Sequence, residues 1–151
     1  MKTQLYTDGA CRGNPGVGGW GVLIKHANSE TELLGYERNT TNNRMELMAA
    51  IQGIQATEND FKEIVVYTDS QYVCNGITQW VKKWKENGWK TASGKPVKND
   101  DLWLTLDQLC ATHCVKWEWV RGHSGNVGNE RADQLANLAI DRFFGLSAEK
   151  D

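Results

Sequence analysis

The sequence has little proline and few cysteines, and it lacks any long apolar run. Of its 151 residues, two are proline and four are cysteine. A membrane-spanning helix needs about 20 consecutive apolar residues, and no stretch approaches that length. The residues after Met1 show no pattern of a secretory leader. We therefore expect a cytoplasmic protein without a membrane partner, folded as one domain over residues 1–151.

The cysteines are too few and too scattered for a disulfide framework or a zinc site. They lie at positions 11, 74, 110 and 114. A chain of this length without a secretory signal needs no disulfides, so we expect free thiols. Cys110, His113 and Cys114 have metal-like spacing, but a structural zinc site needs four ligands in paired clusters, and no second cluster is present.

The sequence has no large excess of either charge, yet its lysines are concentrated in one segment. The formal net charge is −2, which argues weakly against nucleic acid if it is spread evenly. Between Trp80 and Asn99, however, there are six lysines and only one acidic residue, Glu86. This segment therefore has a net charge of +5, and the rest of the chain has a net charge of −7. The lysines are Lys82, Lys83, Lys85, Lys90, Lys95 and Lys98. Tryptophans alternate with them. An amphipathic helix with buried tryptophans is one interpretation, but cations interleaved with aromatics favour a nucleic-acid surface.

Apolar periodicity predicts a mixed α/β domain that begins with an antiparallel meander. The expected strands are Leu5 to the turn at Gly13–Gly16, Trp20–Lys25, Thr31–Arg38, Glu63–Thr68 and Val115–Val120. The expected helices are Asn43–Thr57, Ser70–Gly76, Trp80–Asn87, Asp100–Ala111 and Val127–Phe144, with inward stripes at 47, 50, 51 and 54, at 102, 106 and 109, and at 132, 136, 139 and 143. A C-terminal tail from about 145 is expected to be mobile.

Residues Gly16–Gly21 match the G-x-G-x-x-G pattern of dinucleotide-binding proteins. That pattern must open a helix, whereas the residues that follow alternate as a strand does. We therefore reject a dinucleotide site. The glycines instead indicate close approach of the backbone to something lying across the turn.

Four acidic residues lie near the predicted ends of strands or the predicted starts of helices. Asp8 and Asp69 are expected near strand ends, and Glu46 and Asp133 in the first turns of helices. Each has a local explanation, such as helix capping or the helix dipole. Strand ends and helix starts meet at one edge of such a sheet, however, and four converging carboxylates require cations. Mg²⁺ is the expected ion, with Mn²⁺ as a substitute, and two ions about 4 Å apart would suit in-line phosphodiester hydrolysis.

Several blocks in collinear order resemble type 1 ribonuclease H of the bacterial kind. They are Tyr6-Thr7-Asp8-Gly9, Thr41 to Leu47, Tyr67 to Val73, Trp117 to His123 and Asn129 to Asp133, within a likeness from about Thr3 to Phe144. The resemblance implies a five-stranded mixed sheet, three antiparallel strands first, flanked by helices. It also implies hydrolysis of the RNA strand of RNA–DNA hybrids, leaving 5′-phosphate and 3′-hydroxyl ends, by a monomer.

The resemblance also assigns roles to individual residues. It implies that Asp8, Glu46, Asp69 and Asp133 are the catalytic, metal-binding carboxylates, and that His123 assists proton transfer or product release. It implies substrate contacts by Cys11, Asn14, Thr41, Asn42, Asn43, Gln71, Trp80, Lys82, Lys83, Trp84, Lys85 and Asn99, with Thr41 and Asn99 in a phosphate pocket and the lysines in a basic protrusion of about 80–99.

Two features depart from the family pattern. Some relatives place a cation two residues before the pocket threonine, where this chain has Asn39 beside Arg38, and the protrusion carries Glu86 and Ser93. Two other functions stay open: a hybrid- or RNA-binding module without catalysis, and a DNA nuclease of the same fold.

Overall fold

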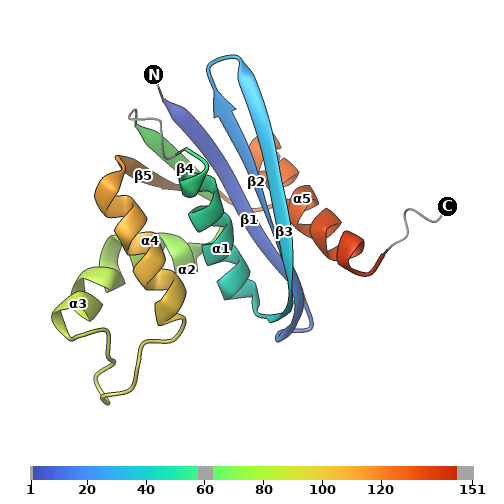
Figure 1. Cartoon of the computed structure of the whole chain (residues 1–151). Helices are drawn as coiled ribbons and strands as arrows, with labels where there is room; N and C mark the ends of the chain where they lie inside the picture. The colour runs from blue at the N-terminus through green and yellow to red at the C-terminus, as the bar shows by residue number, and fades with distance from the viewer. Residues whose placement is uncertain (1, 58–62, 146–151) are drawn as a thin grey trace.

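A five-stranded mixed sheet forms the centre of the computed structural model, which describes residues 2–57 and 63–145 (Figure 1). The strands are β1 (Thr3–Arg12), β2 (Gly16–His26), β3 (Ser29–Thr40), β4 (Ile64–Thr68) and β5 (Val115–Trp119). Their spatial order is β3-β2-β1-β4-β5. β1 pairs antiparallel with β2, and β2 with β3, whereas β4 runs parallel to both β1 and β5. The predicted sheet, with its antiparallel meander first, is confirmed.

Helices cover both faces of this sheet (Figure 1). They are α1 (Asn42–Gln55), α2 (Gln71–Asn75), the π-helical segment η1 (Gly76–Trp80), α3 (Val81–Glu86), α4 (Asp100–Thr112) and α5 (Val127–Phe143). α1 packs on β1 and β2 from one side with α4 beside it, and α5 packs on the same two strands from the other. Within residues 2–57 and 63–145, no helix has the length and apolar character needed to cross a membrane.

The predicted break between two helices around residues 76–80 is wrong, because a π-helical turn joins them into one helical run. Gly76 makes this possible: a Cβ there would lie 2.0 Å from the ring of Trp103. The Thr78 hydroxyl donates to the carbonyl of Cys74 at 2.6 Å, a contact that bends helices. The turn brings the predicted lysine helix against α4.

The glycine-rich stretch belongs mostly to β2 rather than to the turn before it. A Cβ on Gly19 would lie 2.3 Å from the carbonyl oxygen of Ala136, and one on Gly21 would lie 2.5 Å from that of Ala132. The close backbone approach predicted here is therefore with helix α5, not with a bound molecule. The strand that was predicted after these glycines, in place of the helix that a dinucleotide-binding pattern must open, is confirmed.

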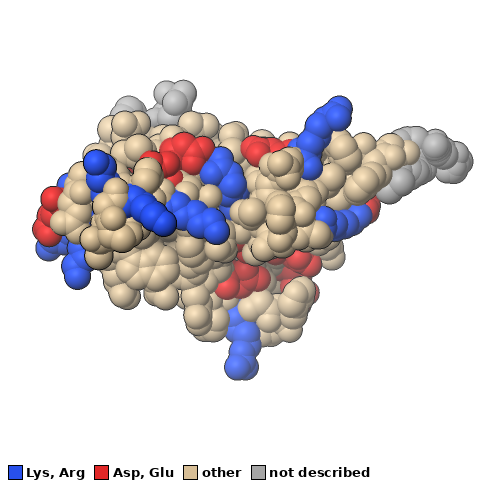
Figure 2. Space-filling model, turned by 90° about the horizontal axis from the view of Figure 1, so that it is seen from below, with Lys and Arg blue, Asp and Glu red and all other residues tan. Residues whose placement is uncertain are grey.

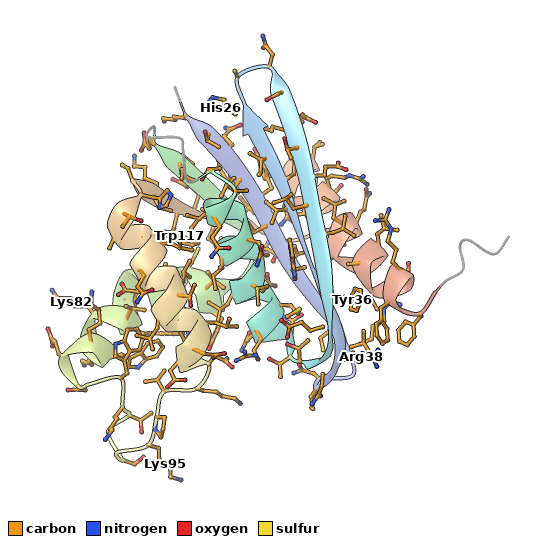
Figure 3. All side chains as sticks on the ribbon, in the orientation of Figure 1. His26, Tyr36, Arg38, Lys82, Lys95 and Trp117 are labelled. Atoms are coloured by element: carbon orange, nitrogen blue, oxygen red, sulfur yellow. The ribbon has the colours of Figure 1, made fainter. Side chains whose placement is uncertain are left out.

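The predicted apolar stripes lie largely in the core, with shifts in two helices. All four stripe residues of α1 are buried. In α4, Leu102 and Leu106 are buried, Leu109 is only partly buried, and the wholly buried Trp103 was not predicted. In α5 the core also takes Leu135 and Ile140, whereas Phe143 packs edge-on against Tyr36 beside the sheet (Figure 3). All four cysteines are free, as predicted. The predicted mobile tail beyond Gly145 lies outside the described residues.

Candidate active site

Two of the candidate carboxylates are brought together by the register of the parallel strands. β1 and β4 pair from Thr3 with Ile64 as far as Thr7 with Thr68. In both segments, the residue that follows this last pair is an acid, so Asp8 and Asp69 lie side by side. Asp8 does not lie at the end of β1 as predicted, because that strand continues to Arg12, paired only with β2. Asp8 instead lies just beyond the end of β4. From Asp8 onward, the edge of β1 that pairs with β4 is uncovered.

Glu46 of α1 lies beside Asp8 and Asp69 because Gly9, the β1 residue against which α1 packs, has no side chain. A Cβ on Gly9 would lie 2.5 Å from the backbone nitrogen of Glu46, so only glycine lets α1 pack this closely on β1. Carboxylate oxygens of Asp8, Glu46 and Asp69 lie within 4.8 Å of one another. In the described part of the chain, this is the one cluster of three or more His, Cys, Asp or Glu that could hold a metal ion, and the rejected zinc site is not among such clusters.

Asp133 approaches the cluster from α5 on the other side of the sheet. Its carboxyl is near enough to that of Asp8 to raise the pKa of Asp8, although Asp133 is not one of the three residues whose oxygens lie within 4.8 Å of one another. It lies in the second turn of α5, which begins at Val127, and Glu46 likewise follows the first turn of α1. The prediction that both acids occupy first turns is therefore wrong. Because neither Glu46 nor Asp133 lies at a helix terminus, neither residue caps its helix, and both side chains are available to the cluster.

The local explanations for the acids are also excluded by the caps that the structure uses. Thr41 caps α1 by accepting from the N–H of Arg44 at 3.2 Å. Ser70, rather than Asp69, caps α2 by accepting from the N–H of Val73 at 3.1 Å. None of the four carboxylates is used as a helix cap.

Burial and mutual repulsion make this cluster costly to ionise without a cation. Burial raises the pKa of Asp8 from its ordinary 3.8 to about 8, with repulsion from Asp69 next, although the N–H of Gly9 acts in the opposite direction. Burial, then the charges of Asp8 and Asp69, raise the pKa of Glu46 well above its ordinary value. Oε1 of Glu46 is buried without a hydrogen-bond partner. An orphaned carboxylate oxygen beside other acids fits a divalent cation, which would supply the missing contact.

The loop that follows β5 lies directly against the cluster. A Cβ on Gly122 would lie 2.6 Å from Oδ2 of Asp69, so the loop backbone touches that carboxylate. His123 comes next, is exposed and has a φ of 55°. The N–H of Gly125 donates to Glu130 on α5 at 3.1 Å. The loop thus holds His123 at the rim of the carboxylate cluster, where a substrate could reach it.

Residues 1–141 match the sequence family described as RNase H. The chain belongs to the ribonuclease H family. Family membership makes it an enzyme, a hydrolase with endoribonuclease activity, and a divalent cation is the general cofactor of the ribonuclease H family.

Individual relatives cover nearly the whole chain. A Ribonuclease H of Pseudomonas putida (strain W619) is 62% identical over 140 residues, which are 93% of this chain and 94% of that protein. A Ribonuclease H of Francisella tularensis subsp. novicida (strain U112) is 57% identical over 144 residues, 95% of this chain and 94% of that protein. Among solved structures, LC9-RNase H1, a type 1 RNase H, matches with a TM-score of 0.84 and 36% identity, over 93% of this chain and 72% of that chain.

The candidate substrate contacts of this ribonuclease H chain lie on three elements near the cluster. Asn14 accepts from the N–H of Asn42 at 2.8 Å, which joins the first turn of the chain to the start of α1. The Cys11 thiol donates to the carbonyls of Gly13 and Thr40 at 3.2 and 3.4 Å, and burial raises its pKa. Asn43 and Gln71 are exposed at the starts of α1 and α2. These contacts gather the asparagine candidates; their role toward a substrate stays a prediction.

The basic segment, residues 80–99, forms a projection away from α5 (Figure 1). Lys82 on α3 and Lys95 in the following loop point outward at this end of the molecule (Figure 3), and lysine and arginine side chains gather there when it is seen from below (Figure 2). Lys85 forms an ion pair with Asp107 at 3.3 Å. A pocket of about 290 Å³ is lined by Gln79, Trp80, Lys83 and Trp84. Trp84 packs on Trp103, whereas Trp80 stays 36% exposed; binding of nucleic acid by this segment stays a prediction.

Two residues at the site were not singled out from the sequence. Asn129 is only 2% exposed, and its Nδ2 lies 3.4 Å from Oδ2 of Asp69, within donating distance. Trp119 donates from Nε1 to the carbonyl of Asp69 at 3.1 Å. Its position one turn before Asp133, in one of the blocks that resemble ribonuclease H, was a usable signal for Asn129. Nothing in the sequence distinguishes Trp119 from the alternating residues of its strand.

The raised pKa of Asp8 predicts that the metal-free protein loses stability as pH rises. An acid whose pKa is raised on folding stabilises the native state fully below its unfolded pKa, and this contribution is lost as pH rises through the folded pKa. For Asp8 the window runs from 3.8 to about 8. We expect urea unfolding in EDTA to give a free energy of unfolding lower by at least about 1–2 kcal/mol at pH 8 than at pH 5. Mg²⁺ should reverse most of the loss.

Asp8→Asn is the matched control for this pH dependence. It removes the titrating group and its repulsion of Glu46, so its free energy of unfolding should change less between pH 5 and pH 8. Equal pH dependence in the variant and the parent would contradict the assignment of the loss to Asp8.

Proposed function

We propose that this chain is an endonuclease that hydrolyses the RNA strand of RNA–DNA hybrids at the carboxylate cluster, leaving 5′-phosphate and 3′-hydroxyl ends. One observation carries the proposal: carboxylate oxygens of the buried Asp8 and Glu46 and of the partly buried Asp69 lie within 4.8 Å of one another, and Asp133 is near enough to raise the pKa of Asp8. All come from one chain, so a monomer suffices. The relatives named Ribonuclease H support the activity, since that name describes RNA cleavage in hybrids.

The four carboxylates would hold two Mg²⁺ ions, with Mn²⁺ as a substitute. Bound ions of this kind supply a water of lowered pKa and stabilise a leaving oxygen during in-line displacement. Glu46 offers Oε1 without a competing hydrogen bond, and Asp69 is held by Trp119 through its carbonyl. The backbone at Asp69 is thus anchored before the ions arrive, which limits the reorganisation that binding requires.

Other residues of the chain would bind the hybrid and move a proton. His123 is exposed and follows Gly122, whose backbone lies against Asp69, and it would take or give a proton near the scissile phosphate. Asn14, Asn42, Asn43 and Gln71 offer amide groups that can read the 2′-hydroxyl of RNA from the minor groove, together with Cys11. The basic segment would hold the phosphates of the second strand.

A panel of substrates tests the proposal. The same sequence is offered as RNA–DNA hybrid, duplex DNA and duplex RNA, each with Mg²⁺ and with EDTA. We expect the RNA strand of the hybrid alone to be cut, and only with Mg²⁺. Cleavage of duplex DNA would favour the DNA nuclease, and tight hybrid binding without cleavage would favour the non-catalytic module.

Removal of lysines from α3 tests the basic segment. If Lys82, Lys83 and Lys85 contact phosphates, each releases condensed counterions, and log K falls with log salt by about 0.9 per contact. Replacing all three by alanine should flatten that slope by up to about 2.7, or by about 1.8 if Lys85 stays with Asp107. KM should rise at moderate salt while kcat is nearly unchanged.

Lys116→Ala provides the control for this series. Lys116 is exposed and paired with Glu63 at 3.6 Å near the start of β5, at the opposite end of that strand from the carboxylates. Its removal should leave the salt slope of hybrid binding unchanged. An unchanged slope in the triple variant as well would remove α3 from the binding surface.

A further inference from the structure

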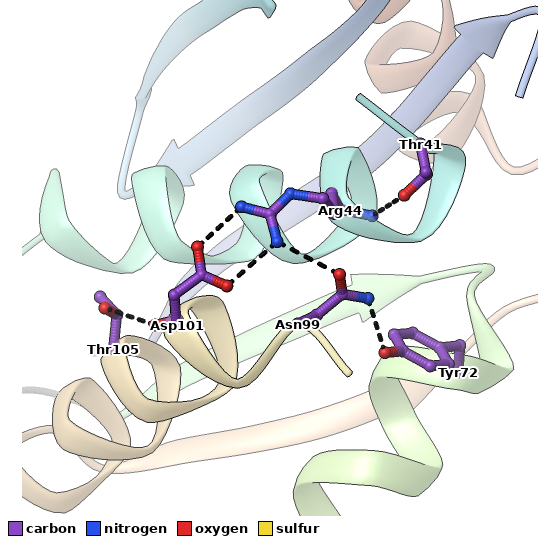
Figure 4. Close-up of polar contacts among 6 residues, drawn as sticks. All are labelled: Thr41, Arg44, Tyr72, Asn99, Asp101 and Thr105. Carbon is purple, nitrogen blue, oxygen red and sulfur yellow. Dashed lines mark hydrogen bonds and ion pairs between the residues drawn. The ribbon is translucent and has the colours of Figure 1, made fainter. Parts of the chain in front are cut away.

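A polar network joins the start of α4 to the first turn of α1, and the proposed function leaves its centre, Arg44, unused (Figure 4). The Arg44 guanidinium donates to both carboxylate oxygens of Asp101, at 3.0 and 2.7 Å. Its Nη1 also donates to Oδ1 of Asn99 at 3.2 Å. Nδ2 of Asn99 donates to the Tyr72 hydroxyl oxygen at 3.0 Å, and Nε1 of Trp103 donates to the same oxygen at 3.1 Å.

The donors in this network determine where each proton lies. A guanidinium has no acceptor, so the amide oxygen of Asn99 must face Arg44 and its nitrogen must face Tyr72. An indole N–H also only donates, so the Tyr72 oxygen accepts two hydrogen bonds. The hydroxyl's own hydrogen is then left for a third partner. In the part of the chain that the structure describes, Tyr72 donates no hydrogen bond.

Tyr72 and Asn99 both lie where a bound duplex would pass. Tyr72 is three residues beyond Asp69, and its ring packs edge-on against Trp80 of the basic segment at 5.8 Å. Both side chains are partly exposed. Asn99 begins α4 with a φ of 62°, and its side chain makes no capping hydrogen bond, so its amide is committed to Arg44 and Tyr72 instead. The network therefore lies between the carboxylate cluster and the lysines.

We propose that Arg44 is a positioning residue for substrate binding: by fixing the Asn99 amide, it directs the second N–H of Asn99 and the hydroxyl hydrogen of Tyr72 toward a phosphate of the hybrid. The inference rests on the proposed function and adds Tyr72 to the substrate contacts. A phosphate oxygen accepts such hydrogen bonds and cannot donate in return, so it matches a surface from which only hydrogens point outward.

The alternative is that Arg44 merely ties α1 to α4 through its ion pair with Asp101. Three variants separate the two roles: Arg44→Met removes the donors, Asp101→Asn weakens the ion pair but keeps the contact from Arg44 to Asn99, and Tyr72→Phe removes the hydroxyl. Arg131→Met is the matched control, because Arg131 forms a similar two-bonded ion pair with Glu32, at 2.6 and 2.9 Å, outside the network.

Steady-state kinetics on one hybrid should divide these variants into two groups. We expect Arg44→Met and Tyr72→Phe each to raise KM about five- to twenty-fold, the effect of one or two lost hydrogen bonds, with kcat within about twofold. The double variant should raise KM by less than the product of the two single effects, because Arg44 acts in part through the Tyr72 hydroxyl. Asp101→Asn and Arg131→Met should leave KM within about twofold. Thermal unfolding of every variant checks that each is folded at the assay temperature.

Substrate phosphates provide the second arm. Single methylphosphonates, which are neutral, are placed at successive positions of each strand. At one position, the methylphosphonate should raise the KM of the parent enzyme. The same methylphosphonate should raise the KM of Arg44→Met and of Tyr72→Phe much less.

The possible outcomes distinguish this inference from the proposed function. If the parent enzyme does not cut the hybrid, the proposed function fails. If it does, an unchanged KM in Arg44→Met, or an equal rise in Asp101→Asn, overturns the positioning role. A methylphosphonate effect that is the same in the parent and the variants also overturns it.

Discussion

Asp8→Asn should abolish Mg²⁺-dependent cleavage of an RNA–DNA hybrid while leaving hybrid binding intact or improved. Asp8 is 4% exposed, has a carboxylate oxygen within 4.8 Å of those of Glu46 and Asp69, and has a pKa that is also raised by Asp133. Its loss removes a ligand from the centre of the site. Since metal-ion catalysis contributes several kcal/mol of charge stabilisation, we expect kcat to fall by at least about 10³-fold.

Binding should move in the other direction because the substitution removes a negative charge that faces phosphate. Single-turnover cleavage with Mg²⁺ measures the first effect, and equilibrium binding of the hybrid in EDTA measures the second. Asp141→Asn is a suitable control, since Asp141 is exposed and pairs with Arg12 at 2.9 Å on the far part of α5. Appreciable Mg²⁺-dependent activity in pure Asp8→Asn would contradict the role assigned to Asp8.

His123→Ala should lower kcat by about 10²–10⁴-fold, the usual contribution of a proton-transferring side chain. KM should change far less, because the residue is exposed at the rim and the amides and lysines that bind the hybrid are untouched. Water can replace the imidazole in part, so residual activity is expected. A rise in KM with kcat preserved would mean that the loop binds substrate only.

Gly122→Ala separates the position of this loop from the chemistry of its histidine. The added Cβ would lie 2.6 Å from Oδ2 of Asp69, so the loop must move away from the cluster. We expect kcat to fall although His123 is still present. Ser124→Ala, in the same loop but with only a contact to the carbonyl of Arg121, should behave as the parent enzyme.

Strand and helix periodicity was sufficient to predict the first antiparallel meander and most elements, because apolar alternation follows directly from burial, whereas the five-stranded mixed sheet was implied by the resemblance. The run Ile64–Thr68 was recognisable since both of its faces are covered. The joining of α2 to α3 was not predictable, because it depends on Gly76 fitting against the ring of Trp103, a contact between distant segments. The residues next to Gly76 in the sequence do not indicate that Trp103 packs against it.

The acidic residues of the site were predictable as candidates, but their convergence was not. Asp8 and Asp69 meet because β1 and β4 pair in one particular register, and Glu46 joins them because Gly9 admits α1. Register and helix packing are properties of the whole fold. The resemblance to ribonuclease H supplied that information in advance, whereas spacing alone left each acid with an adequate local explanation. Arg44 was missed for the same reason, since its partners lie on α4.

Cleavage of a hybrid in ¹⁸O-labelled water tests most directly that the carboxylate cluster hydrolyses RNA by water attack. The enzyme is given Mg²⁺ and the products of the RNA strand are examined by mass spectrometry. Water attack with departure of the 3′-oxygen predicts one ¹⁸O atom in each new 5′-phosphate and an unlabelled 3′-hydroxyl. A 2′,3′-cyclic phosphate opposite an unlabelled 5′-hydroxyl would show attack by the 2′-hydroxyl, and a 3′-phosphate would show departure of the 5′-oxygen; either product would contradict the account.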